Sequence, residues 1–154
     1  MEWLVARRIP LQEVQARLRA YQDKYGSLSH LHEEYSKGRI PPGVFQEYIE
    51  WTNMSHALRA YQEGEDFEYV ADESLELSPE EARCLTHTRL ELLDFLSREK
   101  VNSINELAHR LGRNVKNVYQ DLRALEALGL LALNREGNRS VPEPLVSEIS
   151  IRFS

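Results

Sequence analysis

The sequence has little cysteine and no long apolar run. Cys84 is the single cysteine among 154 residues, so no internal disulfide can form and we expect a reducing, cytoplasmic setting. No apolar stretch approaches the roughly 18 residues that a membrane-spanning helix needs. The first eight residues become charged too soon for a secretion signal. We therefore expect no membrane partner.

The sequence also lacks the residue patterns of a catalytic or cofactor site. It has no glycine-rich phosphate loop, no nucleophile elbow, and no histidine or cysteine cluster with metal-ligand spacing. Its carboxylates gather in one stretch, which does not fix the paired geometry that acid–base catalysis requires. We therefore expect a binding protein without cofactor or metal, and not an enzyme.

Positive charge is scarce except in one region. The chain has a net charge of −6, and residues 60–82 hold nine carboxylates with no lysine or arginine. Residues 98–140 instead hold eight basic and five acidic side chains, a net charge of +3. Such asymmetry is expected when one face of an acidic protein meets phosphate groups.

Residues 103–128 carry the pattern around which the chain is organised. Ser103 and Glu106 have the spacing of a capping box, Gly112 is placed to end that helix, and Asn114 is a good N-cap for the next. Apolar residues repeat at helical period in both segments, at Ile104, Leu107, Ala108 and Leu111, and at Val115, Val118, Leu122 and Leu125. The spacing predicts a helix-turn-helix, although a helical hairpin within a core would show it too.

The flanking segments favour the first interpretation. Residues 130–133 and 139–141 can pair as strands around a turn at 135–138. Residues 85–96 predict a preceding helix, capped by Thr86 or Thr88 and presenting Leu90, Leu93 and Leu96. The stretches NSINELAHRLGRNVKNVYQDLRALEALGLLAL and NREGNRSVP resemble the winged-helix transcriptional regulators of bacteria and archaea. The resemblance covers roughly residues 85–153 and implies a DNA-binding domain.

In such a domain the second helix of the pair enters the major groove of duplex DNA. A buried stripe of Val115, Val118 and Leu122 would leave polar side chains facing outward, where asparagine or glutamine can bind adenine and lysine can reach guanine or phosphate. Tyr119 borders the core and can pack inward or stack on a sugar, while Asp121 would repel phosphate. Few cations per subunit favour a homodimer on two half-sites. The candidate DNA-binding residues are Ser103, Arg113, Asn114, Lys116, Asn117, Tyr119, Gln120, Arg123, Arg135, Asn138 and Arg139.

The N-terminal half predicts a short strand or arm at residues 2–9, then helices at 11–25, from Ser27 or Ser29 to about 38, and from Pro41 onward. The third helix has a broad aromatic face that suits either the core or a partner surface. The acidic residues 63–77 suit either a linker or a segment that binds a basic partner. Ser78 and Pro79 predict a helix start, and residues 145–153 a strand beside the wing or across a dimer.

The segments YQDKYGSLSHLHEEYSKG, FQEYIEWTNMSHAL and EGEDFEYV resemble the front ends of small prokaryotic winged-helix proteins encoded beside toxins. This resemblance implies an antitoxin that represses its own operon and binds a basic toxin protein. The candidate partner-binding residues are Tyr48, Trp51, Tyr61, Asp66, Phe67 and Tyr69.

We therefore expect a mainly α fold with a small β-wing. Its expected parts are a helical dimerisation or partner-binding unit (1–62), an acidic segment (63–77) and a winged helix-turn-helix domain (78–154). The expected function is sequence-specific DNA-binding transcriptional regulation, as an autoregulatory antitoxin. The alternatives are a stand-alone transcription factor and an interaction scaffold whose winged helix binds no DNA.

Overall fold

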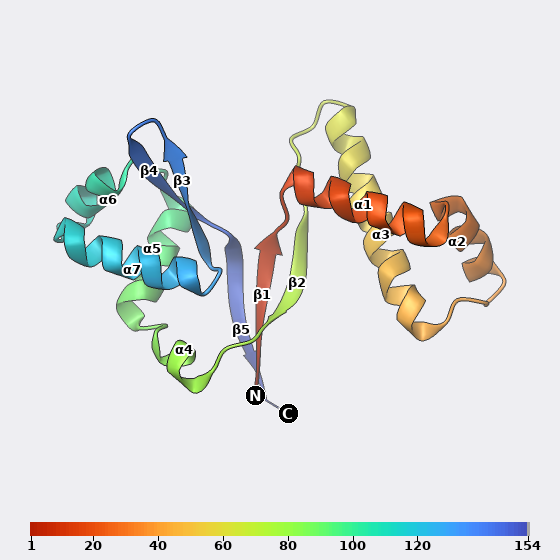
Figure 1. Cartoon of the computed structure of the whole chain (residues 1–154), viewed down its shortest axis with the longest axis horizontal. Coiled ribbons are helices and arrows are strands. Elements are labelled where there is room, and N and C mark those ends of the chain that lie inside the picture. The colour runs from red at the N-terminus through yellow and green to blue at the C-terminus, as the bar shows by residue number, and fades with distance from the viewer. Residues whose placement is uncertain (154) are drawn as a thin grey trace. The chain divides into compact units, whose positions relative to one another are not determined.

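The computed structural model describes residues 1–153 and divides the chain into two compact units (Figure 1). One unit, the helical unit, is Arg8–Ala71. The other, the C-terminal unit, combines Met1–Arg7 with the chain from Asp72 onward. The helical unit is thus an insertion between two parts of the C-terminal unit. Within residues 1–153, no helix combines the length and apolarity needed to cross a membrane.

These bounds differ from the predicted divisions at residues 62/63 and 77/78. They differ because the first strand of the chain pairs with the last strand in one sheet. Strand β1 (Glu2–Arg8) pairs antiparallel with β5 (Val146–Arg152), in a register that sets Trp3 opposite Ile151 and Val5 opposite Ile149. A pairing between segments so far apart in sequence has no local signature.

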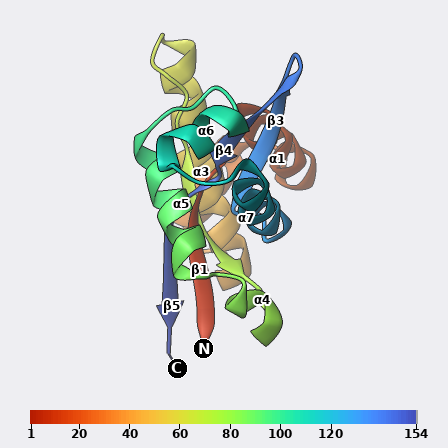
Figure 2. The same cartoon turned by 90° about the vertical axis from the view of Figure 1, so that its left-hand side faces the viewer.

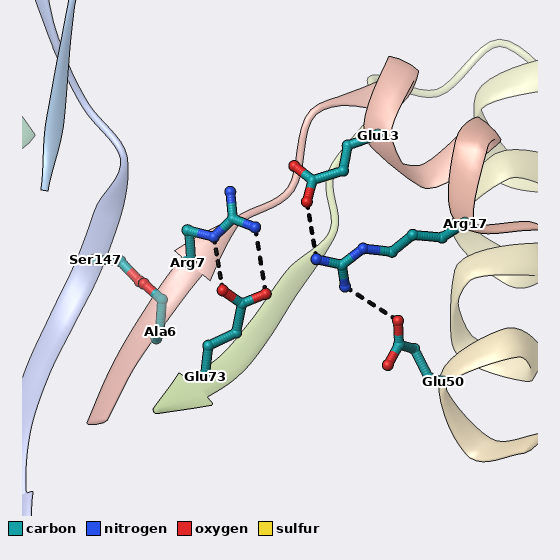
Figure 3. A network of polar contacts seen from close by, with 7 residues as sticks. All are labelled: Ala6, Arg7, Glu13, Arg17, Glu50, Glu73 and Ser147. Atoms are coloured by element: carbon teal, nitrogen blue, oxygen red, sulfur yellow. Dashed lines mark hydrogen bonds and ion pairs between the residues drawn. The ribbon is translucent and has the colours of Figure 1, made fainter. Parts of the chain in front are cut away.

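Strand β2 (Val70–Leu75) completes a three-stranded sheet in the order β2-β1-β5. Across this sheet Arg7 binds Glu73, with its Nε 2.8 Å and its Nη2 3.3 Å from the two carboxylate oxygens (Figure 3). Part of the acidic segment 63–77 is therefore a sheet strand. The C-terminal strand was predicted beside the wing or across a dimer, and that prediction is wrong for this chain because β5 lies beside β1.

The helical unit contains α1 (Leu11–Tyr25), α2 (Leu28–Ser36) and α3 (Pro42–Gln62), which confirms the three predicted helices. Ser27 caps α2 by accepting a hydrogen bond from the backbone N–H of His30, and Pro42 takes the first position of α3. The chain enters and leaves this unit side by side, because the N–H of Ile9 donates to the carbonyl of Tyr69 at 2.9 Å.

Aromatic side chains fill the core of the helical unit. Trp51 stacks on Tyr21 at 5.8 Å between ring centroids, and Tyr48 stacks on Tyr35 at 5.4 Å. Tyr48 and Trp51 are each only 6% exposed, so the structure places these two partner-binding candidates in the core. Tyr61 is 41% exposed. The aromatic face of α3 was expected to suit either the core or a partner surface. Tyr48 and Trp51 lie in the core, and Tyr61, near the end of the helix, is exposed.

Ion pairs tie the helices of this unit together on its surface. Arg17 of α1 binds Glu13 one turn earlier at 2.8 Å and Glu50 of α3 at 3.0 Å (Figure 3). Glu47 of α3 accepts hydrogen bonds from the hydroxyl of Tyr25 and, at 3.3 Å, from the ammonium group of Lys24. The hydrogen bond from Tyr25 holds the pKa of Glu47 below its ordinary value, with Lys24 adding to the effect.

The C-terminal unit contains α4 (Pro79–Arg83), α5 (His87–Arg98), α6 (Ile104–Leu111) and α7 (Val115–Ala127), followed by the hairpin β3 (Leu131–Glu136) and β4 (Arg139–Pro144). The predicted helix-turn-helix, preceding helix and hairpin are therefore present in the predicted order. Ser78 begins α4 with a complete capping box, and Thr86 caps α5. In Figures 1 and 2 the tip of the hairpin extends beyond α6 and α7.

One apolar core joins these elements. Leu92, Leu107 and Leu122, from α5, α6 and α7, are each no more than 2% exposed. Two residues of the predicted apolar stripes lie outside it, with Leu90 40% and Val115 43% exposed. The buried face of α5 instead follows Leu92, Leu93 and Leu96. Val115 is the first residue of α7, where the side chain leans past the end of the helix.

Candidate functional site

The turn between α6 and α7 is built by local signals. Gly112 ends α6 in the left-handed conformation at φ +62°, which L side chains adopt only at a cost. Two residues later the side-chain oxygen of Asn114 accepts hydrogen bonds from the backbone N–H groups of Lys116 at 2.8 Å and Asn117 at 3.4 Å. This cap fixes the direction in which α7 leaves the turn. The N-cap role predicted for Asn114 is confirmed.

Helix α7 has one buried and one exposed face. Val118, Leu122 and Leu125 are all 0% exposed and form the buried face. At about 100° per residue, the opposite face is centred on Lys116 and Gln120, with Asn117 at its margin. All three are exposed, and within residues 1–153 their side chains form no hydrogen bond or ion pair. They are therefore free to bind a ligand.

Tyr119 and Arg123 extend the exposed face of α7. Tyr119 is 43% exposed, which decides the alternative between inward and outward packing in favour of the surface. The guanidinium of Arg123 lies 6.0 Å from the Tyr119 ring centroid and 3.5 Å from the carboxylate of Glu126. Contacts of this kind on an exposed helix are weak, so Arg123 can leave Glu126 for another anion.

The start of α6 offers a further polar group. The hydroxyl oxygen of Ser103 accepts a hydrogen bond from the N–H of Glu106 at 3.0 Å, which leaves its proton available for a ligand. The carboxylate of Glu106 accepts instead from the N–H of Asn102 at 2.8 Å. The predicted capping box is therefore formed in one half only, with Glu106 reaching back one residue further than expected.

The hairpin presents the remaining candidates at and beside its tip. Gly137, at φ +63°, and Asn138 form the two-residue turn, with Glu136 opposite Arg139 in the register. Arg135, Asn138 and Arg139 are exposed. Across the part of the chain that the structure describes, no carboxylate lies within ion-pairing distance of either arginine. The tip therefore carries two arginines without an ion-pair partner and, with Glu136, a net charge of +1.

Asp121 behaves differently from the prediction, and Arg113 is one of its two partners. The carboxylate of Asp121 accepts a hydrogen bond from the Nη2 of Arg113 at 2.6 Å and another from the Nε of Arg89 at 3.0 Å. Its side chain is only 14% exposed. Asp121 is thus neutralised by two arginines and is not a bare negative charge facing a ligand. Sequence reasoning missed Arg89 because it lies 32 residues before Asp121 and no local pattern connects them.

The partner-binding candidates from the acidic segment, Asp66, Phe67 and Tyr69, lie in the helical unit. Phe67 and Tyr69 pack against its Ile9, Val14 and Met54 core, and the Phe67 ring meets Tyr61 edge to face at 5.9 Å. Asp66 is exposed. The aromatic residues of this segment therefore hold it against the helices.

The described residues contain no group of three or more histidine, cysteine or acidic side chains arranged to hold a metal ion. Cys84 is half-buried, packs against the core of the C-terminal unit, and places its Sγ 3.5 Å from the carbonyl of Glu80. In this position Cys84 serves as a small apolar side chain.

One family model matches part of the C-terminal unit. This model, described as HVO_A0114, matches residues 84–151, less than half of the chain. No curated protein matches. A solved structure with 27% identity and a TM-score of 0.39 is a homodimeric winged helix-turn-helix DNA-binding domain (fragment 1–100, Mb0332) from Mycobacterium bovis, described as a possible ArsR-family transcriptional regulator. The similarity covers 42% of this chain and 60% of that one.

Proposed function

We propose that this chain is a sequence-specific DNA-binding transcriptional regulator that places α7 in the major groove of duplex DNA. It acts by binding and not as an enzyme. The observation that carries the proposal is the exposed face of α7. There the side chains of Lys116, Asn117 and Gln120 have no partner within residues 1–153, although the opposite face of the helix is fully buried. A helix held this firmly presents its polar side chains in a fixed direction, as base recognition requires.

Each group on this surface has chemistry that suits part of a duplex. The amides of Asn117 and Gln120 can each donate to and accept from one adenine edge, and the Lys116 ammonium can donate to guanine or to phosphate. Arg135 and Arg139 on the hairpin would bind phosphates or enter an adjacent minor groove. The cations are few for one site, so we propose a homodimer that binds two half-sites.

The test is binding of the purified protein to the DNA upstream of its own gene, titrated across salt concentration with random duplex as competitor. The proposal predicts preference for the upstream duplex and an affinity that falls steeply as salt rises, because phosphate contacts release counterions. Equal binding to both duplexes at every salt concentration would favour the interaction scaffold, in which a protein partner covers α7.

A narrower version of the proposal makes the regulator an autoregulatory antitoxin. Its support is the resemblance of the N-terminal half to antitoxin front ends, together with the exposed acidic residues 63–68. It predicts that the chain relieves the growth arrest caused by a basic protein encoded by the adjacent gene. Replacing Glu65, Asp66 and Glu68 with the neutral amides should abolish that relief and leave DNA binding intact. Relief that survives these substitutions would remove the acidic segment from the proposal.

A further inference from the structure

Three segments of the C-terminal unit meet at one carboxylate. Asp121 of α7 binds Arg113 in the turn before that helix and Arg89 near the start of α5. The three side chains are 14%, 28% and 23% exposed, respectively. One negative and two positive groups leave this cluster with a net charge of +1. The cluster therefore still attracts an anion.

The two arginines differ in how many donors they have left. The guanidinium of Arg89 also donates from Nη1 to the carbonyl of Cys84 at 3.0 Å, so it is held from two sides. Within the described chain, the only hydrogen bond of the Arg113 side chain is the one to Asp121. A guanidinium has five N–H donors in a planar fork, so Arg113 keeps donors that a further acceptor can use.

Arg113 also stands where a phosphate would meet α7. It directly precedes Asn114, the N-cap, so it lies beside the positive end of the helix dipole. A long flexible side chain normally loses rotamer freedom when it binds, which weakens binding. The contact with Asp121 fixes the guanidinium before DNA arrives.

We propose that Asp121 is a positioning residue for DNA binding, which holds Arg113 ready to bind a backbone phosphate at the N-terminus of α7. This inference rests on the proposed function. The guanidinium of Arg113 would bind one phosphate oxygen of the DNA backbone. This contact would increase affinity and fix the register of the protein on the duplex, but it would not distinguish between bases.

Whether Asp121→Asn weakens or tightens DNA binding distinguishes a positioning role for Asp121 from simple repulsion of phosphate. If Asp121 only repelled phosphate, Asp121→Asn would tighten DNA binding, because it removes a negative charge from the interface. If Asp121 positions Arg113, the same substitution weakens binding by about 10-fold, the equivalent of one charge-assisted hydrogen bond. Glu126→Gln is the matched control, since it removes one negative charge from the same helix and should not weaken binding.

The experiment measures binding of a fluorescently labelled duplex from the upstream DNA across salt concentration. The full-length protein is compared with Asp121→Asn, Arg113→Ala and the double variant. Arg113→Ala should weaken binding by about 10-fold and reduce the slope of log affinity against log salt by about one. In the double variant, the loss should be no greater than in Arg113→Ala alone, because Asp121 acts through Arg113.

A purely structural role for Asp121 would give another pattern. Asp121→Asn would then lower affinity by the same factor with and without Arg113, and that result overturns the inference. The inference is also overturned if Asp121→Asn binds DNA as tightly as the unsubstituted protein, or if Arg113→Ala leaves the salt slope unchanged. The measurement on Arg113→Ala remains valid even if Asp121→Asn does not fold. Failure of the unsubstituted protein to prefer the upstream duplex would overturn the proposed function and this inference together.

Discussion

Met54 allows a direct test of whether the two units are stabilised independently. Its side chain is 0% exposed in the core of the helical unit, together with Ile9 and Val14. Met54→Ala removes most of a buried side chain and leaves a cavity, at a cost of about 2–5 kcal/mol. A unit of 64 residues has a stability of only about 3–10 kcal/mol, so this loss is a large fraction of the total.

The two tryptophans of the chain report on the units separately. Trp3 lies on β1 in the C-terminal unit and Trp51 lies in the core of the helical unit. Urea unfolding is followed by fluorescence in a Trp3→Phe background, which keeps the second reporter, and in a Trp51→Phe background, which keeps the first. With a slope of about 1 kcal/mol/M, Met54→Ala should lower the midpoint of the Trp51 transition by roughly 2 M or more.

The transition of Trp3 should stay where it is, and specific DNA binding should persist. Leu122→Ala is the matched control, because this residue is equally buried but belongs to the C-terminal unit. It should shift the Trp3 transition and reduce DNA binding. Equal shifts of both reporters on Met54→Ala would refute the reasoning, since the chain would then unfold as one cooperative structure.

Three further predictions concern single features. Gly112→Ala should lower the stability of the C-terminal unit by about 1 kcal/mol, or roughly 5 °C in melting temperature, because an L residue is strained at φ +62° although its Cβ would meet no atom within 4 Å. Glu47→Gln, which weakens the bond from Tyr25, should cost the helical unit about 0.5–1 kcal/mol at pH 7. Because the pKa of Glu47 is lowered in the folded chain, the difference between the two proteins should shrink as pH falls from about 4.5 through that lowered pKa. Replacing Arg135 and Arg139 with alanine should weaken binding to every duplex alike and reduce the salt slope by about two.

Each of these predictions has a control in the same chain. Gly112→Asn should cost less than the alanine variant, because asparagine tolerates the left-handed conformation better. A melting curve of Glu47→Gln that differs equally from the unsubstituted protein at pH 3 and pH 7 would contradict the pKa argument. Arg98→Ala should leave the salt slope unchanged, because this arginine is the last residue of α5, which is not part of the proposed DNA-binding surface.

Local signals allowed the helices of the chain to be predicted well. Ser78, Thr86 and Asn114 begin the helices that they were expected to begin, and Gly112 ends α6. Each of these signals acts through hydrogen bonds or backbone angles within a few residues, so the sequence around it is sufficient. The same holds for the hairpin, whose turn lies between two short apolar segments.

Features that depend on distant residues could not be predicted in this way. β2 lies in a segment so rich in carboxylates that it suggested a linker, and Glu73 meets its partner Arg7 only when β2 lies beside β1. The cluster of Arg89, Arg113 and Asp121 likewise forms only when α5 packs beside α7. From the sequence alone, Asp121 was expected to repel phosphate, whereas in the fold Arg89 and Arg113 neutralise its charge.

The most direct test of the central claim is replacement of Lys116, Asn117 and Gln120 together by alanine, followed by measurement of the ratio of affinities for the upstream and random duplexes. Gln12, Gln15 and Arg19 replaced by alanine on the exposed surface of α1 are the control. If α7 reads bases, the ratio should fall by about 10- to 100-fold or more in the first variant only, while weak binding to any duplex remains. An unchanged ratio, in a variant that melts like the unsubstituted protein, would contradict the account.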